Sequence, residues 1–171
     1  MPFTPFHFGP GALLKSIAPR QLSFTVFAFS QFLIDLEPAL MWVVRGEPVH
    51  PYLHTYAGAL PVALVAIWPG RQICEWALGV WNAQMSPAQA RWLAFPARIG
   101  MREAALGAFL GAYSHVAIDS LMHEDMRPLA PFSQAGRLTG IVAIDTLHLL
   151  CVAAGIAGLL VLAALRRMRK V

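Results

Sequence analysis

Long apolar stretches separated by short polar loops dominate the pattern of this chain. Four of them suit helices that cross a hydrocarbon core about 30 Å thick, although the second is short. They are residues 21–44, 54–69, 97–120 and 138–165. Residues 1–20 are interrupted by proline and glycine, which predicts a re-entrant or interfacial segment. We therefore expect an all-α fold: a polytopic membrane helical bundle of about four transmembrane helices with short additional helices, in a single domain over residues 1–171.

Prolines predict where these helices break. The residue before a proline avoids the α conformation, so the first span should stop or kink near Leu36, just before Glu37-Pro38. The run Trp68-Pro69-Gly70-Arg71 reads as a turn, and residues 72–83 then read as a separate interfacial helix. A helix that ends at Pro38 would let two neighbouring acids, Asp35 and Glu37, turn toward one centre.

Composition supports the membrane and gives an orientation. The chain is 57% hydrophobic and only 13% charged, whereas a soluble domain is about a quarter charged. Its net charge is +4, and the basic residues gather in particular loops, which indicates orientation rather than nucleic-acid binding. Basic segments stay in the cytoplasm, which puts both termini and residues 71–102 there. The regions 35–54 and 115–137 should then lie at the extracytoplasmic face.

The third apolar stretch ends in His115-x3-Asp119-x3-His123. Residues four apart share one face of a helix, so these three side chains should form one polar stripe. Ionisable groups on an apolar helix are costly unless they pair or hold a metal. A water-facing stripe is the alternative, and His123 is the member closest to the loop.

Further candidate ligands come from distant parts of the chain but, by the predicted topology, from the same face. His54 opens the second span, with Thr55 available to orient its ring and His50 four residues earlier. His7 precedes Gly9-Pro10-Gly11, a breaker that would let the backbone fold back into the bundle. For Asp35 and Glu37, capping or pairing with Arg45 remains the structural alternative. For the histidines, a structural role at a helix end remains the alternative. The complete set of predicted metal ligands is His7, Asp35, Glu37, His50, His54, His115, Asp119 and His123.

Histidine nitrogen and carboxylate oxygen suit zinc, and also manganese or iron. The two cysteines, Cys74 and Cys151, are far apart and form no Cys-x2-Cys motif. We expect one or two divalent ions, which can activate water and grip a phosphoryl or carbonyl oxygen. A carboxylate, Glu37 or Asp35, is the predicted catalytic base. Arg45 or Arg127 is a candidate contact for a substrate phosphate.

The order of these motifs resembles a bacterial family of small inner-membrane proteins described as membrane-bound metal-dependent hydrolases. The resemblance covers most of the chain and rests on Met-Pro-Phe-Thr-Pro-Phe-His at residues 1–7, Asp35-x-Glu37-Pro38, His54-Thr55, and Ser114-His115-x3-Asp119-x3-His123 followed by Arg127-Pro-Leu-Ala-Pro-Phe132. The family's metal pattern is likened to that of zinc-dependent phospholipase C. The resemblance implies that His7, Asp35, His54, His115 and Asp119 bind metal. The chain departs from the family at Glu37, where its paired acids have aspartate.

Three functions follow as hypotheses. The first is a metal-dependent hydrolase of the inner membrane that acts at its extracytoplasmic face on a phospholipid or another lipid-linked ester. The second is a non-enzymatic metal or haem protein, or a metal transporter, for which histidines facing each other at mid-bilayer are expected. The third is a structural membrane protein whose polar stripe satisfies itself. The expected partners are membrane lipids and a lipid substrate, with no nucleic acid.

Overall fold

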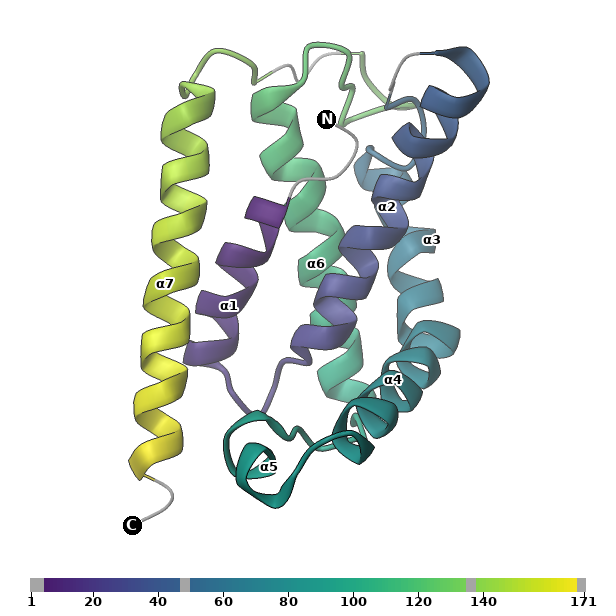
Figure 1. Cartoon of the computed structure of the whole chain (residues 1–171). Helices are drawn as coiled ribbons and strands as arrows, with labels where there is room; N and C mark the ends of the chain where they lie inside the picture. Colours follow the sequence, from purple (N-terminus) through teal and green to yellow (C-terminus); the bar gives the residue numbers. More distant parts are fainter. Residues whose placement is uncertain (1–4, 47–49, 135–137, 169–171) are drawn as a thin grey trace.

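The computed structural model describes residues 5–46, 50–134 and 138–168, and within them it contains helices and no strand (Figure 1). Four helical stretches are long and apolar enough to cross a membrane, which confirms the expected all-α helical bundle: Phe24–Arg45, Tyr56–Ala83, Met101–Met122 and Ile144–Met168. The elements are η1 (Pro5–His7), α1 (Phe8–Ile17), α2 (Phe24–Arg45), α3 (Tyr56–Val65), the π-helix η2 (Ala66–Gly70), α4 (Arg71–Ala83), α5 (Pro87–Leu93), α6 (Met101–Met122) and α7 (Ile144–Met168).

Helices α2 and α6 form the centre of the bundle and approach closely because α6 carries glycine where they meet. A Cβ atom at Gly107 would collide with the carbonyl oxygen of Ser23, and one at Gly111 would collide with the Ser30 side chain. Small residues allow membrane helices to pack backbone against backbone. The packing is reinforced at one end by a hydrogen bond from the Ser23 backbone N–H to the Glu103 carbonyl oxygen, at 3.0 Å.

Neither proline ends a helix, so the stop considered near Leu36 and the turn predicted at residues 68–71 are both wrong. Helix α2 continues through Pro38 and ends only at Gly46, whose φ of 80° is left-handed. Residues 68–70 of the expected turn belong instead to the π-helical segment η2, and Arg71 begins α4, so the helix is continuous from α3 to α4. A proline removes only one helical hydrogen bond, whereas leaving the helix in an apolar medium would expose many backbone groups. The wider π-helical turn also accommodates Pro69 without ending the helix.

Helix α1 is a half-length helix that runs beside α7 (Figure 1). Gly9 of α1 and Gly158 of α7 allow this contact, because a Cβ at either position would collide with the backbone of the other helix. Lys15 closes the turn that follows α1 by donating to the carbonyl oxygens of Pro19 and Leu22, at 2.7 and 2.6 Å. The part of the predicted re-entrant segment that is described, from Pro5 on, therefore enters the bundle and carries His7 at its inner end.

The bundle has two unlike ends. The loops at residues 50–55 and 123–134 lie at the end where α6 finishes and α7 begins (Figure 1). The other end carries the basic residues Lys15, Arg71, Arg98, Arg102, Arg166 and Arg167. Asp35 lies eleven residues into α2, about 16 Å along its axis, and His115 lies fourteen residues into α6, about 21 Å along its axis. Both are therefore on the side of the bundle away from this basic end.

Candidate metal centre

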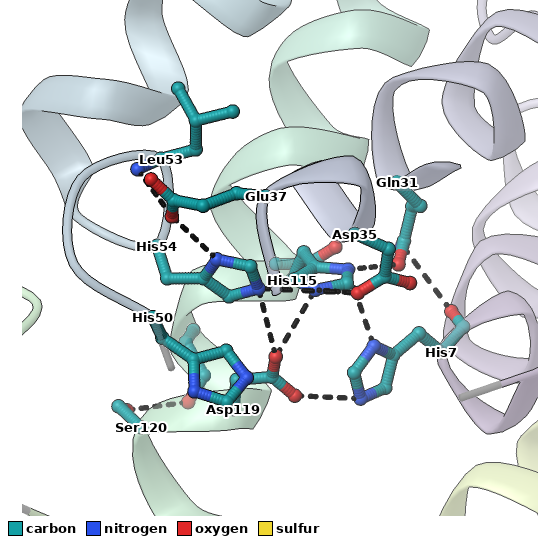
Figure 2. Close-up of polar contacts among 12 residues, drawn as sticks. His7, Gln31, Asp35, Glu37, His50, Leu53, His54, His115, Asp119 and Ser120 are labelled. Atoms are coloured by element: carbon teal, nitrogen blue, oxygen red, sulfur yellow. Dashed lines mark hydrogen bonds and ion pairs between the residues drawn. The ribbon is translucent and has the colours of Figure 1, made fainter. Parts of the chain in front are cut away.

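Two histidines and two aspartates from three segments meet inside the bundle. Asp35 comes from α2, His54 from the residues just before α3, and His115 and Asp119 from α6. All four side chains are buried, and one ligand atom from each lies within 4.8 Å of the others. Figure 2 shows their polar ends turned toward one another. We call these four residues the inner cluster.

The distances within the inner cluster suit a metal ion. His115 Nε2 lies 3.1 Å from Asp119 Oδ2 and 3.3 Å from Asp35 Oδ1. His54 Nε2 lies 3.5 Å from Asp119 Oδ2 and 3.9 Å from Asp35 Oδ1. In a tetrahedral site with ligands about 2.0–2.2 Å from the ion, neighbouring ligand atoms are roughly 3.3–3.6 Å apart. Only small shifts would be needed to seat an ion among these atoms.

Unpartnered buried atoms give a second, independent sign of a ligand. His7 Nε2, His54 Nε2, His115 Nε2 and Asp119 Oδ1 are buried and form no hydrogen bond of regular geometry, although the three nitrogens lie 3.1–3.9 Å from aspartate oxygens. Buried polar atoms without partners are rare because each costs about 1–3 kcal/mol. A divalent cation would accept the three nitrogen lone pairs and balance the two aspartate charges. The residues therefore fit the ion that the sequence predicts.

Helix α6 presents His115 and Asp119 as the sequence predicts. They are one turn apart, their nearest atoms are 3.1 Å apart, and their side chains are almost fully buried. The same face carries Gly111 and Ala112, which are also buried. These small residues let α2 come close enough for Asp35 to reach His115. Asp35 therefore joins the His115–Asp119 pair because α2 and α6 pack closely.

The loop at residues 50–55 carries His54 to the centre and is held by Thr55. The Thr55 hydroxyl accepts the Gly58 N–H at 2.8 Å and donates to the Tyr52 carbonyl oxygen at 2.8 Å. Thr55 is thus the N-cap of α3, and it does not orient the His54 ring as the sequence suggested. A Cβ at Gly58 would collide with the Tyr52 carbonyl oxygen, so the tight loop requires glycine there.

Glu37 contacts the outer side of His54. Its Oε2 atom lies 3.3 Å from His54 Nδ1 and accepts the Leu53 N–H at 2.8 Å, while Oε1 accepts the Tyr52 N–H at 3.1 Å. The expectation that Asp35 and Glu37 turn toward one centre is corrected, because α2 does not end at Pro38. On a continuous helix residues two apart face different directions, and the two carboxylates contact opposite nitrogens of one imidazole ring. A carboxylate behind a metal-binding histidine fixes its tautomer and orientation.

Gln31 orients the His115 ring as Glu37 orients the His54 ring. The sequence does not predict this role. Gln31 Oε1 accepts the His115 Nδ1–H at 2.9 Å, which leaves Nε2 for the centre. The Gln31 amide donates to the His7 carbonyl oxygen at 3.4 Å. The available signal was its spacing, since Gln31 precedes Asp35 by four residues in an apolar span and is almost fully buried.

His7 lies next to the inner cluster, beside α6. Its Nε2 atom lies 3.2 Å from Asp119 Oδ1, and its ring stands edge-on to that of His115. Burial lowers the pKa of His7 to about 4, although nearby Asp119 acts in the opposite direction. Burial also lowers the pKa of His54. Both rings are therefore neutral at pH 7, the state in which histidine binds metal.

A second group, which we call the outer cluster, lies beside the inner cluster and is more exposed. His50, His123 and Asp125 place ligand atoms within 4.8 Å of one another, and the His50 ring stacks on His123 and stands edge-on to His54. Asp125 Oδ2 accepts the His50 backbone N–H and lies 2.9 Å from His50 Nδ1. Burial alone would raise the pKa of Asp125, but these His50 contacts lower it. The sequence predicts the two histidines as ligands but not Asp125.

The two arginines considered for substrate binding lie apart from the inner cluster. Arg45 is exposed at the last turn of α2. Arg127 is also exposed and donates to Gln134 Oε1 at 2.8 Å. Both are on the same half of the bundle as the outer cluster, so a role in substrate binding stays a prediction.

No family model, curated protein or solved structure matches this chain. The family resemblance therefore stays a prediction, and the case for a function rests on the geometry of the site.

Proposed function

We propose that this protein is a membrane-embedded, metal-dependent hydrolase that acts on a phospholipid or another lipid-linked ester. The observation that carries the proposal is the convergence of three unpartnered histidine Nε2 atoms on two buried aspartates inside a bundle of membrane-length helices. Zinc fits this donor set best, and manganese or iron also accept it.

Charge balance supports a resident cation. Within the described part of the chain, the ion pairs of Asp35 and Asp119 are with histidines alone, and no lysine or arginine joins them. Two carboxylates buried without a cation would be strongly destabilising. A divalent ion neutralises them. The outer cluster offers a second binding position, consistent with the predicted one or two ions.

The chain's residues then divide the work of hydrolysis. A bound divalent ion supplies Lewis acidity, which polarises a phosphoryl or carbonyl oxygen and lowers the pKa of an attacking water. His54, His115 and Asp119 hold the site, and Glu37 and Gln31 orient the two imidazole rings from behind. Of the two carboxylates that the sequence offers as the base, Glu37 and Asp35, we assign proton acceptance to Asp35, which reaches the centre through Oδ1. Glu37 is less suited to that step, because both of its oxygens already accept hydrogen bonds.

The location of the site supports a lipid substrate. The inner cluster lies in the half of the bundle away from the basic loops and the basic end of α7. Basic loops remain cytoplasmic, so we assign the site to the extracytoplasmic half of a bacterial inner membrane, with the basic end of α7 in the cytoplasm. The predicted cytoplasmic N-terminus is not part of this assignment, because α1 runs from His7 beside Asp119 toward the basic end. Lipid headgroups and ester bonds lie at this level, and exposed Arg127 is available for a phosphate.

The haem alternative receives less support. Axial haem ligation needs two histidines that face each other across a wide, flat macrocycle. Here the histidine nitrogens lie 3.1–3.9 Å from carboxylate oxygens, which suits a single small divalent ion instead.

Hydrolysis can be tested directly. Purified protein loaded with Zn²⁺, Mn²⁺ or Fe²⁺ would be placed in nanodiscs made from a bacterial total-lipid extract, and products would be followed by mass spectrometry. We expect a lipid to be converted by the wild type and not by Asp119→Asn. The control is Glu124→Gln, which changes an exposed carboxylate near the outer cluster and should retain activity. Stoichiometric metal with an unchanged lipid pool would refute the hydrolase while leaving the metal site intact.

A further inference from the structure

An apolar groove of about 370 Å³ lies along α1 and α7. Four elements contribute its lining, among them α1 itself: Pro5 and Phe6 of η1, Phe8 and Ala12 of α1, Phe24 of α2, and Val152, Ile156 and Leu159 of α7, among others. The α7 positions lie on one face and are open to the surroundings of the bundle. Because α7 is a membrane-length helix, this opening faces the acyl chains of the bilayer.

The groove follows from the way α7 joins the bundle. Helix α7 is largely unburied and packs mainly on α1. Gly9 and Gly155 bring the two backbones together, since a Cβ at Gly9 would collide with the Cys151 carbonyl and one at Gly155 would lie 3.2 Å from the Gly9 Cα. Larger side chains, such as Phe8 of α1 and Ile156 of α7, then line the groove on either side of this backbone contact. The result is a slot with a backbone floor and apolar walls.

The groove is linked to the metal centre by one short segment of chain, whose side chains alternate between the two. Phe6 and Phe8 line the groove, and His7 between them turns into the centre, where its Nε2 lies 3.2 Å from Asp119 Oδ1. Phe6 also stacks on His148 of α7 with ring centroids 4.3 Å apart. The end of the groove at Phe6 is therefore close to His7 and the inner cluster.

The dimensions suit a single hydrocarbon chain. The α7 lining runs from Cys151 to Leu159, which is about 12 Å along the helix. A narrow, apolar slot of this length that opens sideways to the bilayer favours a flexible chain over a compact polar ligand. We infer that the groove binds one acyl chain of a glycerophospholipid and so presents the lipid's ester and phosphate region to the metal centre. This assignment rests on the proposed function, since it names how that substrate is held.

The test uses a phospholipid with a photoreactive diazirine in one acyl chain, incorporated into nanodiscs with the full-length protein. After illumination, adducts would be mapped by peptide mass spectrometry. We expect adducts to concentrate on α1 and on the groove face of α7. Ile156→Trp fills the middle of the groove and should reduce these adducts several-fold. The matched control is Leu150→Trp, which changes an exposed leucine on the opposite side of α7 and should leave them unchanged.

The outcomes separate this inference from the proposed function, because crosslinking needs no turnover. Groove adducts without hydrolysis would support the acyl-chain site and refute the hydrolase. Hydrolysis with adducts spread evenly around α7, or with equal labelling of Ile156→Trp and the wild type, would overturn the acyl-chain site and leave the hydrolase standing. Metal content verifies that the variants are folded, and Leu159→Trp, at the lower end of the groove, replaces Ile156→Trp if that variant fails to fold.

Discussion

Glu37 offers the sharpest test of how the metal centre is built, because its contacts differ from those of a ligand. It accepts hydrogen bonds from the Tyr52 and Leu53 backbones and lies 3.3 Å from His54 Nδ1. Glu37→Gln keeps the size of the side chain. It removes the negative charge and replaces one acceptor oxygen with an NH₂ group that cannot accept any of these hydrogens. His54 then loses its fixed orientation and part of its basicity.

The size of the effect follows from that geometry. Removing a partner that orients a metal-binding histidine costs roughly 10–100-fold in metal affinity, which is about 1.4–2.8 kcal/mol at 1.4 kcal/mol per tenfold. The ligand atoms themselves remain in place. We therefore expect Glu37→Gln to bind the same number of ions as the wild type at saturation, with a dissociation constant for Zn²⁺ raised by that factor.

A competition titration against a chromogenic zinc chelator measures this directly, with the protein in detergent and Glu124→Gln as the exposed-carboxylate control. Two results would refute the reasoning. An unchanged affinity would mean that Glu37 does not orient a metal-binding His54. Complete loss of the ion at saturating zinc would mean that Glu37 is itself a ligand.

Three further predictions concern the same architecture. Gln31→Leu should weaken zinc binding about tenfold by releasing the His115 ring, and an affinity equal to that of the wild type would contradict the role assigned to Gln31. Chelation with EDTA should lower the thermal midpoint of the wild type, since ligand at 100 times its Kd stabilises by about 2.7 kcal/mol, whereas the midpoint of Asp119→Asn should not respond. Gly107→Val should destabilise the α2–α6 contact by about 1–3 kcal/mol in chemical unfolding, while Gly79→Ala, whose added methyl meets no atom within 4 Å, should not.

Much of the fold was predictable because the membrane imposes a strong pattern. The length and hydropathy of the apolar runs indicate the four membrane-length helices, whereas the orientation derived from the basic loops stays a prediction. The His115–Asp119 pair was also predictable, since a four-residue spacing on a helix is a local property. These features depend on the chain within a few turns and need no knowledge of its neighbours.

The missed features depend on packing. Pro38 and Pro69 break helices in water, but the cost of exposed backbone in an apolar medium keeps both helices continuous. The role of Glu37 depends on the loop at residues 50–55, which brings two backbone N–H groups and His54 to it. Gln31 and Asp125 each contact a histidine more than 70 residues away in the chain. Sequence spacing gives no access to such contacts.

The central claim is that the inner cluster binds a divalent metal, and elemental analysis of the purified protein tests it most directly. The protein would be loaded with zinc, dialysed, and measured by inductively coupled plasma mass spectrometry beside Asp119→Asn and Glu124→Gln, with circular dichroism to verify helicity. The account predicts at least one tightly held ion per chain in the wild type and in Glu124→Gln, and none retained by a helical Asp119→Asn. A folded wild type without metal, or an Asp119→Asn variant with the full wild-type content, would contradict it.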